Sequence, residues 1–307
     1  MKKTSNKSVA AIGIFDGVHR GHQKILKKLT KEASRNNARS LLVTFYPHPR
    51  EVLTGAKSRL LISLKHRAKL IKSSGVDVLR VISFTKTFSR MRQDAFIKNI
   101  LIDRLKIKIL VVGENFLFGR NGKGNFAFLK KASKRYGFKL FGIAPLKLKQ
   151  SLISSTRIRH AIEKGDLKNA AAMLGRPVVV LGTVVKGRRI GRRLGFPTAN
   201  IDPHHEIIPP SGVYTVDVII NKKYYKGILN IGTRPTFGLP RTRAKRVVRG
   251  KDTDPTIELH IFNFKKTIYG KDVEIAFKKK IRNERRFKSA EALRKQIQKD
   301  IILSKRT

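Results

Sequence analysis

Two histidines separated by a glycine lie in a turn that could bind phosphate groups. The segment GIFDGVHRGHQ, Gly13 to Gln23, follows an apolar run and contains His19, Gly21 and His22. Backbone N–H groups at a helix N-terminus attract anions, and a glycine lets the backbone approach them closely. Imidazoles there can donate hydrogen bonds as charge builds in a phosphoryl transition state. Capping or core packing would explain one histidine, but the pair in this context favours a nucleotide-phosphate site.

A second polar cluster lies at the start of another predicted helix. In ISSTRIRHAI, residues 153–162, Ser155 and Thr156 begin the helix, and Arg157 and Arg159 fall in its first turn. Serine and threonine are common N-caps, which is the simpler interpretation. Arginines in a first turn oppose the helix dipole unless an anion lies nearby. The cluster is therefore either an ordinary cap or a second contact to the nucleotide.

A third candidate site lies in the C-terminal half. The run GTVVKGRRIGRRLGFPTANI, residues 182–201, is a glycine-punctuated basic hairpin followed by Pro197, Thr198 and Asn200. It contains no Walker A sequence, so a kinase here would use another phosphate cradle. The hydroxyl and amide oxygens of Thr198 and Asn200 are hard donors that suit Mg²⁺ beside substrate phosphates. Without further support, the same residues would also fit an ordinary turn.

A glutamate on a predicted strand could act as a base. In TIELHIFNF, alternation places Ile257, Leu259 and Ile261 on one face and Glu258 with His260 on the other. A carboxylate on that face can accept a proton from a hydroxyl that attacks the γ-phosphorus. The alternative is a solvent-facing surface glutamate, and we interpret His260 as structural.

The elements that must position these residues indicate an α/β protein with two domains. The apolar runs of the first half alternate with helical patterns, which is typical of a Rossmann-like parallel sheet with helices on its faces. The predicted strands there are 8–15, 40–45 and 107–112, and the predicted helices 23–33, 66–73 and 94–105. From Val178 short apolar runs separated by Gly, Pro and Asn predict a small antiparallel barrel with a C-terminal helix over 289–303. We place the domains at residues 1–174 and 175–307.

Composition limits the classes of site. The chain has no cysteine, which excludes disulfides, thiolate nucleophiles and Cys-based zinc sites. Its formal net charge is +49, from 69 Lys+Arg and 20 Asp+Glu. Basic residues run through nearly every segment, so we favour composition bias over a dedicated nucleic-acid face, and expect only nonspecific nucleic-acid contact. No apolar stretch has membrane-spanning length, so we expect a cytoplasmic protein without a membrane partner.

The N-terminal motifs resemble those of bacterial FAD synthetases, a subgroup of the HxGH-type adenylyltransferases. FDGVHRGHQ and ISSTRIR carry the resemblance, with TFYPHP at 44–49 and GENFLFG at 113–119. It implies adenylylation of FMN by ATP to give FAD and pyrophosphate, with catalytic His19 and His22. The implied ATP contacts are Gly13, Phe15, Asp16, Gly21, Asn115, Ser155, Thr156 and Arg159. Many relatives have DFRFG where this chain has Asn115 and Leu117, a difference that concerns flavin contacts more than the reaction. Core packing explains at least one of Phe116 and Phe118.

The C-terminal motifs are similar to riboflavin kinases. GRRLGFPTANI, GVY, NIGTRPTF, ELHIFNF and IYGKDVEIAFKKKIRNERRF occur in that family's order. This implies a six-stranded barrel, transfer of phosphate from ATP to riboflavin, Glu258 as the catalytic base and Arg282 near the flavin. The implied ATP contacts are Gly182, Gly187, Gly191, Pro197, Thr198 and Asn200, the last two also binding Mg²⁺.

Together the two resemblances match the bacterial bifunctional flavin enzymes, whose small-molecule partners are riboflavin, FMN, FAD and ATP, with Mg²⁺ as cofactor. Two alternatives stay open: a basic nucleic-acid-binding module on a nucleotide-binding scaffold, and activity in only one half. The segment 238–255 looks longer and more basic than is usual for this family. We expect it to be a loop or flap that adds nonspecific affinity for ATP or nucleic acid.

Overall fold

The computed structural model describes residues 8–56, 59–187, 191, 194–204, 206–232 and 255–305. Internal contacts divide the chain into two compact units. The first comprises Met1–Ile158 with Met173–Gly175, and the second Arg159–Ala172 with Arg176–Thr307. The predicted basic segment 238–255 lies outside the described residues except for Pro255. No helix of the described part is long and apolar enough to span a membrane.

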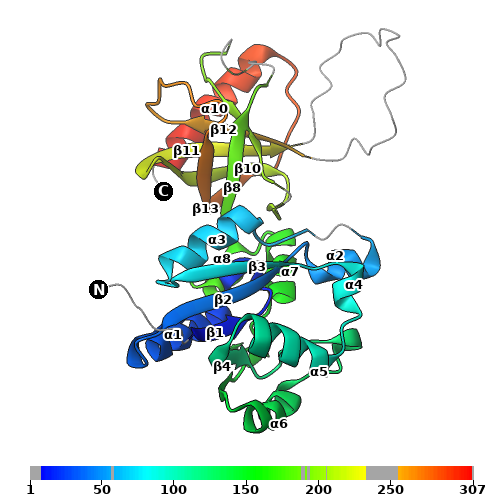
Figure 1. Ribbon diagram of the computed structural model, residues 1–307. Coiled ribbons are helices and arrows are strands. Elements are labelled where there is room, and N and C mark those ends of the chain that lie inside the picture. The colour runs from blue at the N-terminus through cyan, green and yellow to red at the C-terminus, as the bar shows by residue number, and fades with distance from the viewer. Residues whose placement is uncertain are drawn as a thin grey trace. The chain divides into compact units, whose positions relative to one another are not determined.

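The first unit is built on a parallel five-stranded sheet of order β3-β2-β1-β4-β5 (Figure 1). The strands are β1 Ser8–Ile12, β2 Arg39–Tyr46, β3 Val78–Ser83, β4 Ile107–Gly113 and β5 Lys139–Ile143. Central β1 pairs with both β2 and β4, so the order of strands reverses beside it. Ligands of such sheets bind at this switch point, beyond the carboxyl ends of the strands. The histidine turn directly follows β1.

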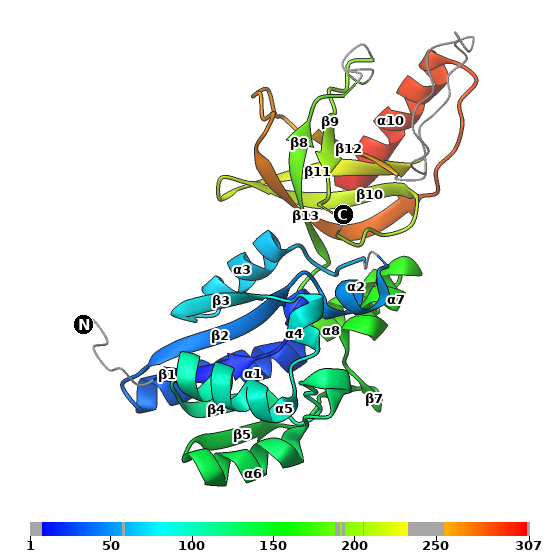
Figure 2. The ribbon, with the colours of Figure 1, turned by 45° about the vertical axis from the view of Figure 1, so that its right-hand side comes forward.

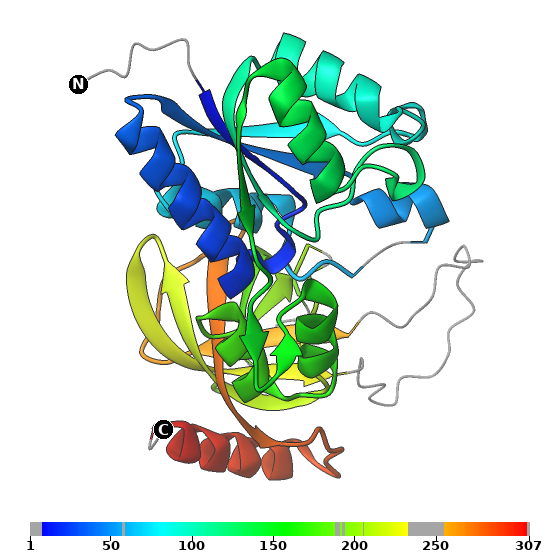
Figure 3. The same cartoon turned by 90° about the horizontal axis from the view of Figure 1, so that it is seen from below.

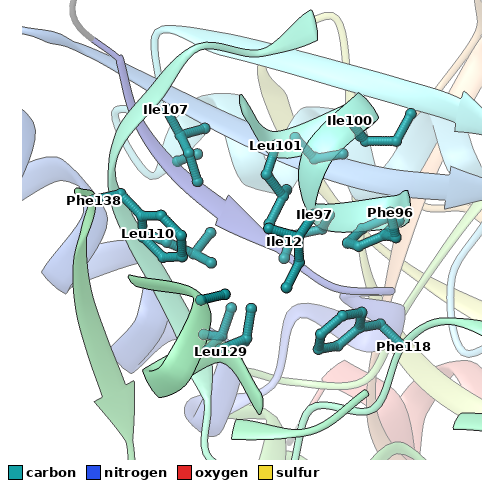
Figure 4. Close-up of a cluster of buried hydrophobic side chains, with 14 of the residues drawn as sticks. Ile12, Phe96, Ile97, Ile100, Leu101, Ile107, Leu110, Phe118, Leu129 and Phe138 are labelled. Atoms are coloured by element: carbon teal, nitrogen blue, oxygen red, sulfur yellow. The ribbon is translucent and has the colours of Figure 1, made fainter. Parts of the chain in front are cut away.

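Helices cover both faces of this sheet. Figure 3 shows α1 Arg20–Arg35 (blue) on one side, and η2 Phe96–Arg104 and α6 Phe126–Tyr136 (teal and green) on the other. Successive strand residues point to opposite faces. Val9 and Ala11 therefore pack with Leu29 of α1 in one hydrophobic cluster. Ala10 and Ile12 point to the opposite face and pack in a second cluster. Figure 4 shows this second cluster, in which Ile12 and Leu110 meet side chains of η2 and α6. The predicted Rossmann-like architecture is confirmed.

The first half contains several helices and one short ribbon. The helices are η1 Asp16–Val18, α1 Arg20–Arg35, α2 Pro49–Thr54, α3 Leu64–Ser73, α4 Lys86–Ser89, α5 Gln93–Ala95, η2 Phe96–Arg104, η3 Arg120–Gly122, α6 Phe126–Tyr136, α7 Ser155–Glu163 and α8 Leu167–Leu174. A two-stranded ribbon is formed by β6 Lys147–Leu148 and β7 Ser151–Leu152.

The sequence prediction missed β3, β5 and α6. Strands β3 and β5 are the two edges of the sheet, and none of their residues is fully buried. An edge strand therefore carries a weak apolar signal. The helix predicted over 94–105 is mostly the π-helix η2, in which Lys98 and Asp103, five residues apart, form an ion pair of 2.7 Å. Helical periodicity indicates a helix without separating α from π geometry.

The second unit contains a closed antiparallel barrel of order β10-β11-β12-β9-β8-β13 (Figure 2). Its strands are β8 Val179–Val185, β9 Ala199–Asp202, β10 Gly212–Ile220, β11 Lys223–Gly232, β12 Thr256–Ile261 and β13 Asp272–Arg282, followed by helix α10 Ala290–Lys305. The six-stranded barrel implied by the kinase resemblance is confirmed. Strand β9 was not predicted because only four residues of the PTAN region pair.

Candidate active sites

The turn after β1 has a backbone that ordinary residues rarely adopt. Phe15, Gly17 and Val18 have φ values of 55°, 81° and 41°. Positive φ is costly for a β-branched valine, and such conformations concentrate at functional sites. Buried Asp16 holds the turn, because its Oδ1 accepts hydrogen bonds from the backbone N–H groups of Leu61 at 3.0 Å and Ile62 at 3.3 Å.

The side chain of Gln23 fixes the other end of the turn. Its Nε2 donates to the carbonyl oxygen of Val18 at 2.9 Å and to that of Leu174 at 2.8 Å. Gly13 precedes the turn, and a Cβ there would lie 3.1 Å from the ring of Phe15. The absence of a side chain at Gly13 therefore leaves room for this buried ring. The predicted ATP contacts Gly13, Phe15 and Asp16 thus build the turn.

The two predicted catalytic histidines stack on each other. Their ring centroids are 3.7 Å apart with an interplanar angle of 17°. His19 is the N-cap of α1, and its Nδ1 accepts a hydrogen bond from the backbone N–H of His22 at 3.4 Å. A Cβ on Gly21 would come within 3.1 Å of the His19 ring, so the glycine allows this cap. Capping, the simpler interpretation of one histidine, therefore applies to His19.

His22 has a different environment. Its Nδ1 is buried without a hydrogen-bond partner in the described part of the chain, and its ring lies 5.0 Å from that of Phe15. Burial, and then the charges of His19 and Arg67, hold the pKa of His22 well below its ordinary value of 6.5. The imidazole is therefore neutral near neutral pH, with one N–H available to a phosphate oxygen.

The two N-terminal motifs meet in the fold. The Oγ of Ser155 donates to the carbonyl oxygen of Asp16 at 2.9 Å, across 139 residues of sequence. Ser154 caps α7, because its Oγ accepts from the backbone N–H of Arg157 at 3.3 Å. The Arg157 guanidinium donates to a backbone carbonyl at 2.6 Å. Capping is thus observed for Ser154, while Ser155 joins the phosphate turn.

Two further predicted contacts of this cluster, Thr156 and Arg159, differ in burial. Thr156 is exposed, and Arg159 is partly buried in the portion of α7 that belongs to the second unit. Their roles stay predictions.

The GENFLFG loop divides into a packed and a solvent-facing part. Phe118 is buried, and its ring stacks on Phe116 with centroids 5.6 Å apart, so packing explains both phenylalanines. Asn115 and Leu117 are exposed. The Asn115 Oδ1 lies 2.9 Å from where a Cβ of Gly113 would stand, which explains the glycine at the end of β4. The loop follows the carboxyl end of β4, and the histidine turn follows the carboxyl end of the neighbouring parallel strand β1, so both lie at the same end of the sheet.

In the barrel, Glu258 is flanked by two asparagines. It pairs in register with Asn200 of β9 on one side and Asn230 of β11 on the other. Burial alternates along β12 as predicted, with Ile257 and Leu259 inward. Burial raises the pKa of Glu258 above 4.5, and its carboxylate accepts no hydrogen bond from the described residues. The arrangement suits a base that awaits a substrate proton. Asn230 was not predicted as a site residue, because only strand register reveals its position.

Three glycines of the 182–191 stretch approach the PTAN segment closely. A Cβ on Gly187 would collide with the side-chain amide of Asn200, and a Cβ on Gly191 would lie 2.9 Å from the Oγ of Thr198. Gly182 is buried, and a Cβ there would collide with Ile201 of β9. These three predicted ATP contacts therefore pack directly on the segment of the proposed metal ligands.

The Pro197–Thr198 part of this segment is anchored from β12. The ring Nδ1 of His260 forms a hydrogen bond of 2.8 Å with the carbonyl oxygen of Pro197. The structural interpretation of His260 fits this contact.

Arg282, predicted to border the flavin, is engaged in a buried ion pair. Its Nη2 and Nε lie 2.8 Å and 3.0 Å from Oδ2 of Asp300, which is 1% exposed. Gln296 also donates to Asp300 at 2.7 Å. Arg282 therefore fixes α10 against the end of β13, and any flavin contact would share the guanidinium with this pair.

Sequence comparisons assign each half of the chain to a family. The FAD synthetase family model matches residues 1–157, and the riboflavin kinase family model matches residues 174–307. A protein named bifunctional riboflavin kinase/FMN adenylyltransferase from Buchnera aphidicola subsp. Schizaphis graminum is 38% identical over 310 residues, 100% of this chain and 96% of the relative. Proteins of the same name from Haemophilus influenzae and Escherichia coli K12 are 39% and 34% identical, over 96% and 97% of this chain and 92% and 91% of their own lengths.

Among solved structures, a Streptococcus pneumoniae protein titled a macrolide-efflux protein has a TM-score of 0.81 and 28% identity, covering 98% of this chain and 95% of its own. That name states a different activity, so the similarity bears on the fold alone. The two family models, and relatives more than 30% identical to this chain over almost its whole length, indicate the same family. This chain belongs to the family of bifunctional riboflavin kinase/FMN adenylyltransferases.

Proposed function

We propose that this protein makes both flavin cofactors with ATP. Residues 175–307 phosphorylate riboflavin to FMN, releasing ADP, and residues 1–174 adenylylate FMN to FAD, releasing pyrophosphate. Relatives whose name states both activities match this chain across both halves, and this observation supports the proposal most. The meeting of Ser155 with Asp16, and of Glu258 with two asparagines, supports one phosphate-handling site in each half.

In the kinase half, Glu258 acts as the general base. A riboflavin hydroxyl attacks the γ-phosphorus of ATP, the bond to the bridging oxygen breaks, and the hydroxyl proton passes to the Glu258 carboxylate. A raised pKa brings the carboxyl closer to the operating pH, which favours proton transfer. The exposed residues Gly187 and Pro197 belong to the proposed ATP cradle.

Thr198 and Asn200 fit a magnesium site shared with the nucleotide. Both are neutral oxygen donors, and Gly187 and Gly191 pack closely against their segment. No group of three or more metal-binding His, Asp or Glu side chains occurs within the described ranges, so protein carboxylates alone would not hold the ion. Mg²⁺ typically binds through few protein ligands plus substrate phosphates, and it neutralises their charge.

In the adenylyltransferase half, positioning and hydrogen bonding do the chemistry. A phosphate oxygen of FMN attacks the α-phosphorus of ATP, and the bond to pyrophosphate breaks. The N-terminus of α1 and the imidazoles of His19 and His22 stabilise the developing negative charge. Ser155, Thr156 and Arg159 hold the leaving phosphates, and Asn115 lies toward the nucleotide or flavin.

Arg282 borders the flavin of the kinase half from the end of β13. We also propose a cytoplasmic location, where riboflavin and ATP are available together.

The test is direct. Purified protein is incubated with riboflavin and ATP, with or without Mg²⁺, and the flavins are separated chromatographically. We expect FMN and then FAD, both dependent on the metal. Accumulation of FMN alone, or FAD only from supplied FMN, would restrict activity to one half. Failure to form either product with any divalent metal, together with retention of RNA, would favour the nucleic-acid-binding alternative.

A further inference from the structure

One buried cation of the first unit has no role in the mechanism above. Arg67 of α3 is 0% exposed and is the largest fully buried side chain of the described residues. Its Nη1 donates to the carbonyl oxygen of Ile14 and to the Oγ of Thr44, the latter at 3.1 Å. Thr44 donates to the same carbonyl oxygen at 2.9 Å. Two side chains from separate elements thus hold one peptide group.

Stability alone does not account for this arginine. Its Nε and Nη2 are buried and have no hydrogen-bond partner in the part of the chain that the structure describes. A buried guanidinium with unpaired N–H groups is costly, and an apolar side chain of similar volume would avoid that cost. Burial lowers the pKa of Arg67, while the charges of Asp16 and Tyr46 favour its protonated form.

The peptide group that Arg67 holds leads directly into the phosphate turn. Ile14 precedes Phe15, where the backbone enters the left-handed region. The loop before α3 also grips this turn, because the backbone N–H groups of Leu61 and Ile62 donate to Asp16. The segment 60–67 therefore fixes the turn at two points, one on each side of Phe15.

Arg67 also acts on the imidazole that the turn presents. Its charge is one of the causes that lower the pKa of His22, after burial and His19. His19 acts on the same imidazole, and Asp16 and Tyr46 act on Arg67. Because Arg67 is fully buried, these effects reach the reacting phosphates through His22 and the backbone.

We infer that Arg67 is a positioning residue for adenylyl transfer: by holding the Ile14 carbonyl it fixes the turn that presents His19 and His22 to ATP. This inference rests on the proposed adenylyltransferase activity. It requires a long side chain with a donor at its end, and it predicts an effect on turnover more than on binding. A misplacement of about 1 Å in a catalytic group can cost on the order of 100-fold in rate.

The test compares Arg67→Met and Arg67→Lys with the exposed control Lys72→Met on the same helix. FAD formation from FMN and ATP is measured together with FMN formation from riboflavin in the same preparations. For Arg67→Met we expect kcat of FAD formation to fall roughly 10- to 100-fold, with both KM values within about 3-fold. Arg67→Lys should recover most of the loss, and Lys72→Met should match the wild type.

A second readout separates positioning from folding. NMR titration of the His22 imidazole should show a higher pKa in Arg67→Met than in the wild type, because one of the charges that lowers it is gone. If Arg67→Met does not fold, Thr44→Val serves instead, because it removes the other side chain that holds the Ile14 carbonyl oxygen. Thr44→Val should also lower kcat of FAD formation. Circular dichroism at the assay temperature checks that each variant is folded.

Wild-type kcat in folded Arg67→Met would overturn the inference. Equal loss of activity and of folded protein in Arg67→Met and Arg67→Lys, with wild-type turnover in Thr44→Val, would assign Arg67 to folding alone and also overturn it. Absence of FAD formation by the wild type would instead refute the proposed function.

Discussion

The kinase base gives a prediction in which activity and stability change in opposite directions. Replacing Glu258 by glutamine keeps the size of the side chain and removes its charge and basicity. A positioned general base contributes about 10² to 10⁴ in rate. We expect kcat of FMN formation to fall by that factor, which corresponds to about 2.7 to 5.5 kcal/mol at about 1.4 kcal/mol per tenfold.

The same change should stabilise the protein at neutral pH. Burial raises the pKa of Glu258 above the value of 4.5 expected in the unfolded chain. The folded state therefore binds the proton more tightly, and stability falls as the pH rises from 4.5 through the folded-state pKa. Glutamine removes this loss, so Glu258→Gln should melt at a higher temperature at pH 7.5, and the difference should vanish below pH 4.5.

The assay measures FMN formation between pH 5 and 9 by flavin chromatography and thermal unfolding by calorimetry. In the wild type the rate should rise with pH through the raised pKa, since only the carboxylate can accept a proton. FAD formation from supplied FMN should be unaffected and serves as the internal control. A Glu258→Gln enzyme with kcat within about 3-fold of the wild type, far below the loss expected of a base, would refute the reasoning.

Three further changes test other parts of the sites. His22→Ala should slow FAD formation by roughly 10² or more while FMN accumulates, and loss of both products would mean that the halves are assigned wrongly. Gly187→Ala places a methyl group against the side chain of Asn200, a proposed metal ligand, so FMN formation should fall at least tenfold. FAD formation from supplied FMN should not change. An unchanged KM for ATP together with an unchanged kcat would contradict the proposal that Gly187 belongs to the ATP site. Asp300→Asn breaks the buried pair with Arg282 and should cost about 3 to 5 kcal/mol in urea unfolding of the second unit. The exposed-pair control Glu291→Gln should cost less than about 1 kcal/mol, and equal effects would show that burial of the Asp300 pair does not matter.

Much of the fold could be predicted because its signals are local. Apolar runs such as 107–112 mark buried strands, and their alternation with helical patterns indicates a parallel sheet. The edge strands β3 and β5 were not predicted, because an edge strand lacks a neighbour on one side and its residues are only partly buried. The apolar alternation of β12 is sufficient to place Glu258 on the face opposite to Ile257.

The candidate sites could be predicted only in part. Sequence placed His19 and His22 beside each other, but their stacking, and the burial that keeps His22 neutral, depend on the side chains packed around them. Asn230 stands beside Glu258 only because β11 and β12 pair in one register. Arg67 is one of 69 basic residues, and nothing in its local sequence distinguishes it.

The sequence by itself determined where the chemistry-bearing residues lie along the chain and which kinds of element carry them, because motif spacing and apolar periodicity are local properties. Tertiary structure alone decided that Ser155 meets Asp16 across 139 residues and that a buried arginine holds Ile14. Such contacts depend on how distant segments pack together, and a side chain's burial, partners and pKa are fixed only once that packing exists.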